Sequence, residues 1–167
     1  MTSDVPKQLT AAVRVRRARA ADGERLRDIA RASKGYWGYD PERVDEWVAG
    51  LDVSLAGLRK KEFYVAEIAR RVVGWSALIP RDDVCWLDDL WIEPEWIGKG
   101  VGTTMFHHAV ARARECAAAR IELEAERHSI GFYEKMGARY VRDSEPGVWG
   151  RISPIMALEL TNGAHTA

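Results

Sequence analysis

A glycine-rich turn at residues 98–102 is the part of this sequence best suited to hold a charged ligand. Gly98, Gly100 and Gly102 alternate with Lys99 and Val101, between an apolar extended run and an amphipathic helical pattern. The first N–H groups of a helix have no partner within the helix and lie at the positive end of its dipole, so they bind phosphates and other anions. Glycines here would let a pyrophosphate reach the backbone donors. The turn therefore predicts an anion site made mainly of main chain.

The spacing of the glycines excludes two common nucleotide-binding motifs. A dinucleotide-binding turn needs its third glycine three residues after the second, and Thr103 occupies that position. A P-loop needs Ser or Thr directly after Gly-Lys, whereas Lys99 is followed by Gly100. On the glycines alone, a plain helix entry without a ligand stays open, so the flanking residues must decide.

Two flanking segments match the signature of one family. Residues 90–94 read Leu-Trp-Ile-Glu-Pro and lead into the glycine turn, and residues 132–137 read Phe-Tyr-Glu-Lys-Met-Gly. Together these segments resemble the GNAT superfamily of N-acetyltransferases, and the resemblance extends from about Val13 to Leu160. It implies an α+β fold, with a GNAT-type mixed, mostly antiparallel central sheet of about six to seven strands and helices on both faces. It also implies acetyl-CoA as the acyl donor.

By this resemblance, the backbone of residues 90–92 offers groups to the pantetheine arm where two strands splay apart, and the Ile92 N–H faces the thioester oxygen. His128 stands near where many relatives carry an Asn that binds the same arm. Ile97 stands where relatives most often carry Arg or Gln, so backbone amides would carry the pyrophosphate contact. The residues expected to bind the cofactor are Leu90, Trp91, Ile92, Ile97, Gly98, Lys99, Gly100, Val101, Gly102, Thr103, His128 and Tyr133.

Tyr133 and Asp89 are the residues that we expect to carry the proton transfers. A phenol with a pKa of about 10 can protonate a departing thiolate, and Tyr133 lies in the Phe-Tyr-Glu segment of the resemblance. The attacking amine must lose a proton, and the nearest carboxylates by sequence are Asp88 and Asp89. Strand alternation would place these two on opposite sheet faces, so only one can point into the acceptor cleft, and we assign Asp89 as the base. Asp88 is a candidate for substrate binding, with a cap or an ion-pair partner as its alternative role. The alternatives for the base are Glu93, Glu124, Glu126 and His128.

The acceptor pocket of GNAT enzymes is commonly built by the first two helices and their connection, which here contains Tyr36, Trp37 and Tyr39. Aromatic walls suit an apolar or cationic amine, so Trp37 and Tyr39 join Asp88 as candidates for substrate binding. Plain packing at the helix junction is the alternative for these rings. The remaining tryptophans are expected in the core or an interface, and they are Trp47, Trp75, Trp86, Trp96 and Trp149.

Hydrophobic periodicity predicts the elements that must position these residues. A strand is expected at Val13 and Val15, a helix at 20–34, and a second helix after the Asp40-Pro41 start signal. Strands at 63–67, 72–79 and 84–92 precede the glycine turn, and a helix at 103–117 follows it directly. A strand at 120–125, a short helix at 129–136 and strands at 140–141 and 150–160 complete the pattern.

Composition predicts a single soluble domain. The chain has 167 residues, 47% of them hydrophobic, and 25 basic residues balance 25 acidic ones. We expect one domain at 13–160 with disordered tails at 1–12 and 161–167. Neither an excess of positive charge nor an apolar run of about 18 residues is present, so we expect no nucleic acid, no membrane and a cytoplasmic location. Cys85 and Cys116 lack the spacing of a zinc site, so no metal is expected.

The sequence thus predicts an acetyl-CoA-dependent N-acetyltransferase that moves an acetyl group to a primary amine of a small molecule, by direct attack with Tyr133 as general acid. The alternative is a non-catalytic CoA-binding sensor or interaction module that keeps the pocket. Many relatives pair two chains through their final strands, and the apolar segment 149–160 would allow such a homodimer.

Overall fold

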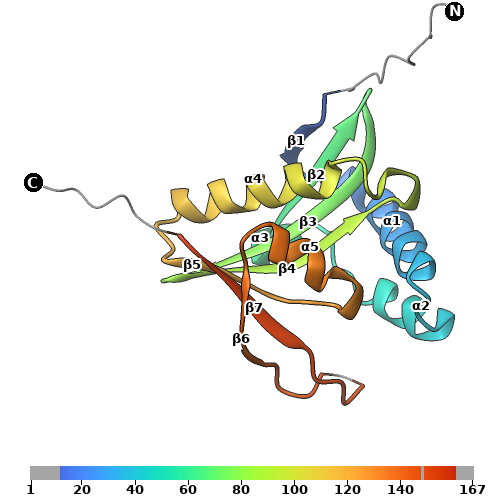
Figure 1. Cartoon of the computed structure of the whole chain (residues 1–167). Helices are drawn as coiled ribbons and strands as arrows, with labels where there is room; N and C mark the ends of the chain where they lie inside the picture. The colour runs from blue at the N-terminus through green and yellow to red at the C-terminus, as the bar shows by residue number, and fades with distance from the viewer. Residues whose placement is uncertain (1–11, 148, 161–167) are drawn as a thin grey trace, which may run out of the picture.

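The chain folds around one seven-stranded sheet in the order β1-β2-β3-β4-β5-β7-β6 (Figure 1). The computed structural model describes residues 12–147 and 149–160, so the predicted disordered tails lie outside it except for Ala12. All neighbouring strands are antiparallel except β4 and β5, which run parallel. The predicted mixed, mostly antiparallel α+β fold is therefore confirmed.

The strands follow the predicted order along the chain. They are β1 (Arg14–Arg17), β2 (Glu62–Ile68), β3 (Arg71–Arg81), β4 (Val84–Ile92), β5 (Arg120–Glu124), β6 (Arg139–Asp143) and β7 (Pro154–Glu159). Ala69 and Arg70 form the two-residue turn between β2 and β3, and both have positive φ, of 48° and 65°. β7 starts later than the predicted residue 150, because Gly150 has a φ of 70° and its N–H donates to the Gly147 carbonyl within a turn.

The helices also follow the sequence pattern, with one short addition. They are α1 (Gly23–Tyr36), α2 (Pro41–Ala49), α3 (Gly57–Lys60), α4 (Val101–Glu115) and α5 (Ile130–Lys135), with 3-10 turns at Ala20–Asp22, Pro94–Trp96 and Arg127–Ser129. Asp40 caps α2 as predicted, since its carboxylate accepts the Arg43 N–H at 3.1 Å. α3 was not predicted. No helix in the described part of the chain is both long and apolar enough to cross a bilayer.

Two clusters of buried side chains cover the two faces of the sheet. α4 and α5 pack on one face, where Met105 and Phe106 are buried against strand residues such as Ile121 (Figure 1). α1 and α2 pack on the other face, where Leu26 lies against Trp75. The Trp75 indole N–H donates to the Leu26 carbonyl at 2.9 Å, so the largest fully buried side chain also has its polar group satisfied.

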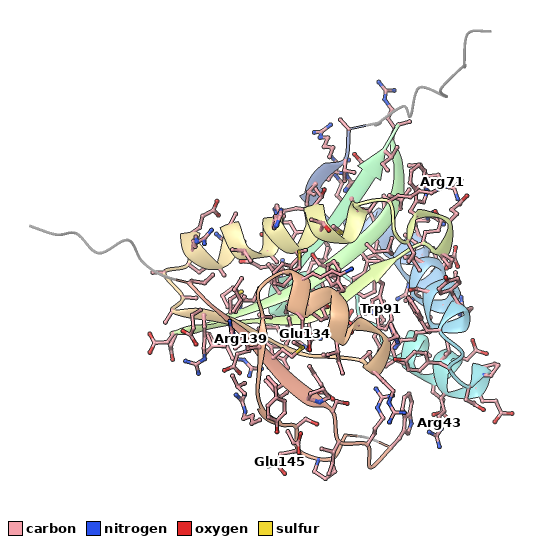
Figure 2. All side chains as sticks on the ribbon, in the orientation of Figure 1. Arg43, Arg71, Trp91, Glu134, Arg139 and Glu145 are labelled. Carbon is pink, nitrogen blue, oxygen red and sulfur yellow. The ribbon has the colours of Figure 1, made fainter. Side chains whose placement is uncertain are left out.

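A β-bulge in β4 determines which face its residues occupy. Ala77 pairs with Asp89 while the next residue, Leu78, pairs with Leu87, so Asp88 is an extra residue in the ladder. Before the bulge, Leu87 packs on the α4 face. After it, Trp91, labelled in Figure 2, packs on the α1 and α2 face. Simple alternation would have kept these two side chains on one face.

Candidate functional site

The sheet opens between its two parallel strands. Pairing of β4 with β5 ends at Leu87 and Leu123, whereas β4 continues to Ile92. The Glu93 N–H donates to the Val73 carbonyl at 2.8 Å, on the β3 side. Because neighbouring residues of an antiparallel ladder direct their N–H groups to opposite edges, the Ile92 N–H faces the open edge. The splay expected from the resemblance is present in the described residues.

The glycine turn presents a row of backbone donors beside this opening. Gly98 and Gly100 have φ values of 77° and 87°, a backbone conformation that side chains other than glycine rarely adopt. Gly100 is the N-cap of α4, and the first helical bond from this turn is donated by the Thr104 N–H to the Gly100 carbonyl at 3.1 Å. Within the described residues, no acceptor is present for the N–H groups of Gly98, Gly100, Val101, Gly102 and Thr103. An anion placed here would satisfy them.

A cavity of about 520 Å³ lies between the glycine turn, the free edge of β4 and α5, and we call it the glycine-loop cavity. Of the residues predicted to bind the cofactor, its lining contains Leu90, Trp91, Ile92, Ile97, Gly98, Gly100, Gly102, Thr103, His128 and Tyr133. Lys99 and Val101 are placed differently. The Lys99 ammonium lies over the Trp96 ring at 5.2 Å, and the Val101 side chain is buried in the core.

A smaller cavity of about 200 Å³ continues from the glycine-loop cavity along β4, and we call it the junction cavity. The two share Leu90, Trp91 and Tyr133 in their lining. Tyr133 is buried, and the loss of water together with the nearby carboxylates of Asp89 and Glu126 raises the pKa of its phenol. The phenol is therefore protonated near neutral pH and carries a proton that it can donate.

Asp89 lies on the wall of the junction cavity with a strongly perturbed carboxyl group. Burial, followed by the neighbouring Asp88, raises the pKa of Asp89 from its ordinary 3.8 to about 7. The Trp91 indole N–H donates to its Oδ1 at 3.0 Å, which holds the carboxylate in place and opposes part of that shift. A carboxyl group that titrates near neutral pH can accept a proton from an amine.

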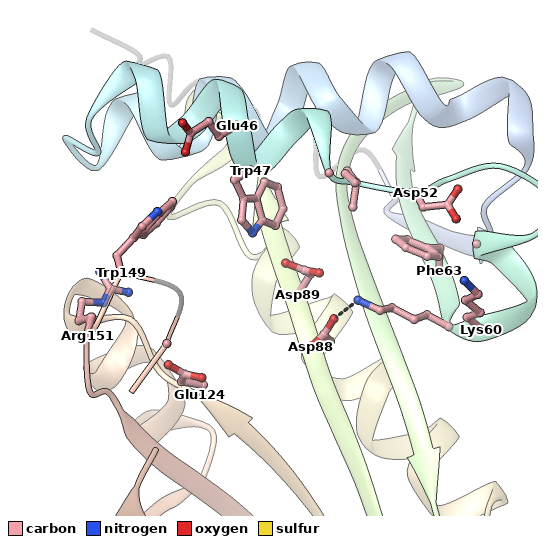
Figure 3. A pocket seen from close by; sticks show the side chains of 15 residues that line it. Glu46, Trp47, Asp52, Lys60, Phe63, Asp88, Asp89, Glu124, Trp149 and Arg151 are labelled. Carbon is pink, nitrogen blue, oxygen red and sulfur yellow. Dashed lines mark hydrogen bonds and ion pairs between the residues drawn. The ribbon is translucent and has the colours of Figure 1, made fainter. Parts of the chain in front are cut away.

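A third cavity of about 640 Å³, the outer cavity, lies beyond the junction cavity (Figure 3). Both contain Trp47, Asp88, Asp89 and Glu124 in their lining. The prediction that Asp88 and Asp89 face opposite sides of the sheet is wrong, because the bulge at Asp88 breaks the alternation. Asp88 forms an ion pair with Lys61, drawn as the dashed line in Figure 3.

The rings predicted to bind the acceptor, Trp37 and Tyr39, lie to one side of the outer cavity, whose lining does not include them. Trp37 stacks on the His128 ring at a centroid distance of 4.1 Å, and it borders the glycine-loop cavity. Tyr39 lies 6.2 Å from His128 and lines a further cavity of about 410 Å³, which Trp37 and His128 also border and which contains Glu126 and Arg151. Burial lowers the pKa of His128, so the imidazole is neutral at pH 7. Tyr39 and Asp88 are thus not brought to the same cavity.

Three residues that line the junction cavity or the outer cavity were not identified from the sequence: Lys34, Trp47 and Trp149. Trp47 and Trp149 were expected only as core or interface residues, yet both line the outer cavity. Lys34 was not considered, although it precedes the aromatic segment by two residues and lies in the last turn of α1. Lysine in a helical pattern normally indicates a solvated face, so no sequence signal distinguished it.

The acetyltransferase (GNAT) family model matches residues 24–138. The chain therefore belongs to the acetyltransferase (GNAT) family, and the predicted family and enzyme class are confirmed. No curated protein gives a significant match to the sequence.

Solved structures of acetyltransferases share the fold. The PaiA N-acetyltransferase of Thermoplasma acidophilum, in complex with coenzyme A, is 20% identical with a TM-score of 0.74, over 89% of this chain and 99% of that one. The ribosomal-protein-S18-alanine N-acetyltransferase of Escherichia coli is 14% identical with a TM-score of 0.70, over 93% and 99%. A GNAT family acetyltransferase of Elizabethkingia anophelis with acetyl-CoA bound is 14% identical with a TM-score of 0.65, over 89% and 98%. At these identities the likeness is one of fold.

Proposed function

We propose that this chain is an acetyl-CoA-dependent N-acetyltransferase that acetylates a primary amine of a small molecule, with Tyr133 as general acid and Asp89 as general base. One observation carries the proposal. The glycine-loop cavity, the junction cavity and the outer cavity lie side by side along β4, because neighbouring cavities share lining residues. Tyr133 and Asp89 both border the middle cavity, where a donor entering from one side would meet an acceptor entering from the other.

The residues of the glycine-loop cavity fit coenzyme A. Its pyrophosphate would accept from the turn amides that have no acceptor in the described structure, and the positive end of the α4 dipole favours its charge. The pantetheine arm would pair with the free edge of β4 at residues 90–92. Ile97 offers no charged side chain to the phosphates, so the main chain carries this contact. Acetyl-CoA supplies an activated thioester when bound.

The side chains at the junction are suited to move two protons in opposite directions. Asp89 takes a proton from the amine, which makes its nitrogen a nucleophile, and its pKa of about 7 leaves a large fraction ionised at neutral pH. The Tyr133 phenol gives a proton to the departing sulfur, and the second proton that the nitrogen loses as the amide forms restores the phenol. The Ile92 N–H at the open edge is positioned to stabilise negative charge on the thioester oxygen, and one such donor is worth about 2.7–4 kcal/mol.

The test is a thiol-release assay with acetyl-CoA over amines, amino acids, aminoglycosides and peptides, together with calorimetric titration of CoA. We expect CoA to bind and at least one class of small amine to release thiol, and Tyr133→Phe to abolish most of that release while CoA still binds. CoA binding without thiol release across the panel would instead support the sensor or interaction module. Failure to bind CoA would refute both.

Three further expectations belong to this proposal and need separate measurements. The cytoplasmic location is tested by fractionation of cells that express the chain. The homodimer through residues 149–160 is tested by light scattering. The single domain at 13–160 is tested by limited proteolysis, which should remove only the terminal segments.

A further inference from the structure

Lys34 is a buried lysine whose ammonium borders the junction cavity. The residue is only 4% exposed. Its Nζ lies 4.0 Å from the centre of a Trp91 ring, 4.3 Å from Trp47 and 4.8 Å from Tyr39. Three aromatic rings from α2, β4 and the α1–α2 connection thus enclose one ammonium group and leave it facing the cavity.

Among the described residues, the Lys34 ammonium has ring contacts but neither a hydrogen bond nor an ion pair. Cation–π contacts replace part of the lost hydration, but a buried charge is normally neutralised by an ion of opposite sign. Two of the carboxylates around the junction already have cationic partners: Asp88 pairs with Lys61, and Glu126 pairs with Arg151. Lys34 is the cation at this cavity that still lacks an anion within the described structure. Burial lowers its pKa to about 8, against the opposing effect of Glu126 and Asp89.

Two carboxylates at the same cavity have no cation within ion-pair distance in the described part of the chain. Asp89 accepts only from Trp91, and Glu124 borders both the junction and the outer cavity. The junction therefore offers one unmatched positive group and two unmatched negative groups within about 200 Å³. A small zwitterion, with an ammonium and a carboxylate on adjacent atoms, complements this arrangement.

We propose that the acceptor carries a carboxylate next to its amine, as α-amino acids do, and that Lys34 binds that carboxylate. The inference rests on the proposed function, which it makes more specific. The ammonium of the acceptor lies beside Asp89, which deprotonates it, and the carboxylate supplies the missing counter-ion of Lys34. An N-terminal or lysine amine within a protein lacks this adjacent carboxylate and is excluded as a preferred acceptor.

The rest of such a molecule would extend into the outer cavity. Its volume of about 640 Å³ accommodates a large side chain, and Trp47, Phe63 and Leu51 provide an apolar wall. Figure 3 shows Trp47 above Asp89, and both residues also line the junction cavity.

The test compares matched acceptors in the thiol-release assay. Each amino acid, for example L-phenylalanine and L-methionine, is paired with its decarboxylated amine and with its carboxamide. Decarboxylation raises the pKa of the amine and amidation lowers it, so the two controls bracket the amino acid in basicity. We expect the amino acid to exceed both in kcat/KM by about 10- to 100-fold, as a charge-assisted hydrogen bond at a buried site implies.

Variants of Lys34 show whether this residue causes the preference for the amino acid over its amine. Lys34→Met should reduce the ratio of kcat/KM between amino acid and amine to near one, and Lys34→Arg, which keeps the cation, should restore much of it. Arg59→Met is the matched control, because it removes an exposed cation that lines none of these cavities, and the ratio should not change. Thermal unfolding of each variant establishes that it is folded.

The pH dependence of the kcat/KM ratio between amino acid and amine shows whether Lys34 acts through its charge or through its packing. The charged or titratable groups that face Lys34 are Tyr39, Asp89, Glu126, His128, Tyr133 and Arg151. Asp89 acts on both members of each pair, so its titration cancels in the ratio. The preference for the amino acid should fall as the pH rises above about 8 and Lys34 loses its proton.

Four results would overturn the inference. These are a wild-type preference for the decarboxylated amine, an unchanged ratio in Lys34→Met, a ratio that is independent of pH from 7 to about 10, or acetylation of Lys34 itself found by mass spectrometry. In each case turnover of some amine would leave the proposed function intact. Absence of turnover with every acceptor would instead refute the proposed function.

Discussion

Replacing Asp89 with Asn should lower turnover and raise stability in the same protein. The reason is the environment of the carboxyl group, whose pKa rises from 3.8 to about 7 because burial and Asp88 disfavour its ionised form. The Trp91 N–H that donates to Asp89 at 3.0 Å can donate equally to the Asn oxygen, so the substitution removes the charge with little change in packing.

The catalytic effect follows from the role of the base. Wild-type kcat/KM should increase about tenfold per pH unit below pH 7 and then level off, since only the ionised form accepts a proton. Asp89→Asn should lower the plateau by about 10² to 10⁴ and remove this acidic limb. The measurement is kcat/KM from pH 5 to about 9 with an acceptor found in the panel.

The effect on stability has the opposite sign. The shift in pKa means that folding disfavours the ionised carboxylate by about 4 kcal/mol at most. Because the folded pKa is raised, wild-type stability decreases as the pH increases from about 4 to about 7 and then stays level. Asp89→Asn lacks this decrease. The free energy of unfolding of Asp89→Asn should exceed that of the wild type by nearly zero at about pH 4 and by the full amount above about pH 7, as measured by urea denaturation.

Asp88→Asn is the matched control for both measurements. It removes a like charge beside Asp89 and releases Lys61, so it should move the acidic limb to lower pH rather than abolish it. An acidic limb near pH 7 that survives in Asp89→Asn would assign the base to another group. A loss of stability in Asp89→Asn at every pH would show that the carboxylate is a structural requirement instead.

Three other predictions concern the acid, the glycine turn and a hairpin. Tyr133→Phe should lower kcat by about 10² to 10⁴ with an unchanged Kd for CoA, measured by steady-state kinetics and calorimetry; normal turnover would remove Tyr133 from the mechanism. Gly100→Ala should destabilise the fold by about 1–2 kcal/mol and weaken CoA binding, because the φ of Gly100 is 87°. Gly131 has equally open space around it and no positive φ, so Gly131→Ala should stabilise the fold by about 0.4–1 kcal/mol. Similar losses of stability in both variants would refute the backbone argument. Ala69→Asn combined with Arg70→Gly should raise the free energy of unfolding by about 1 kcal/mol in thermal melts, since both positions have positive φ, and a decrease would contradict this reading of the turn.

The sequence predicted the fold well where local signals agreed. The Asp40-Pro41 start, the meander of β2, β3 and β4, and the helix directly after the glycine turn all appear in the structure. Each rests on a short-range cause: a capping carboxylate, alternating apolar residues, or backbone donors at a helix start. α3, a single turn at residues 57–60, carries no periodic pattern of useful length and was missed.

The lining of the glycine-loop cavity was predictable for the same reason. Most residues predicted to bind the cofactor line one cavity, since they lie in two segments whose geometry is set by a strand end and a helix start. The acceptor side was not, because its residues come together from α1, α2, β4 and β5. Tyr39 was placed at a different cavity from Asp88 by the path of the α1–α2 connection.

By itself, the sequence determined the family, the order of the elements and the glycine-rich helix entry that we propose as an anion site, since all three depend on residues that are close along the chain. Only the tertiary structure decided how the polar side chains meet. The bulge at Asp88 brings both aspartates to one cavity, and the packing of α1 against α2 and β4 buries Lys34 among three rings. Burial and charge proximity are properties of the packed molecule, and they set the pKa values on which the chemistry depends.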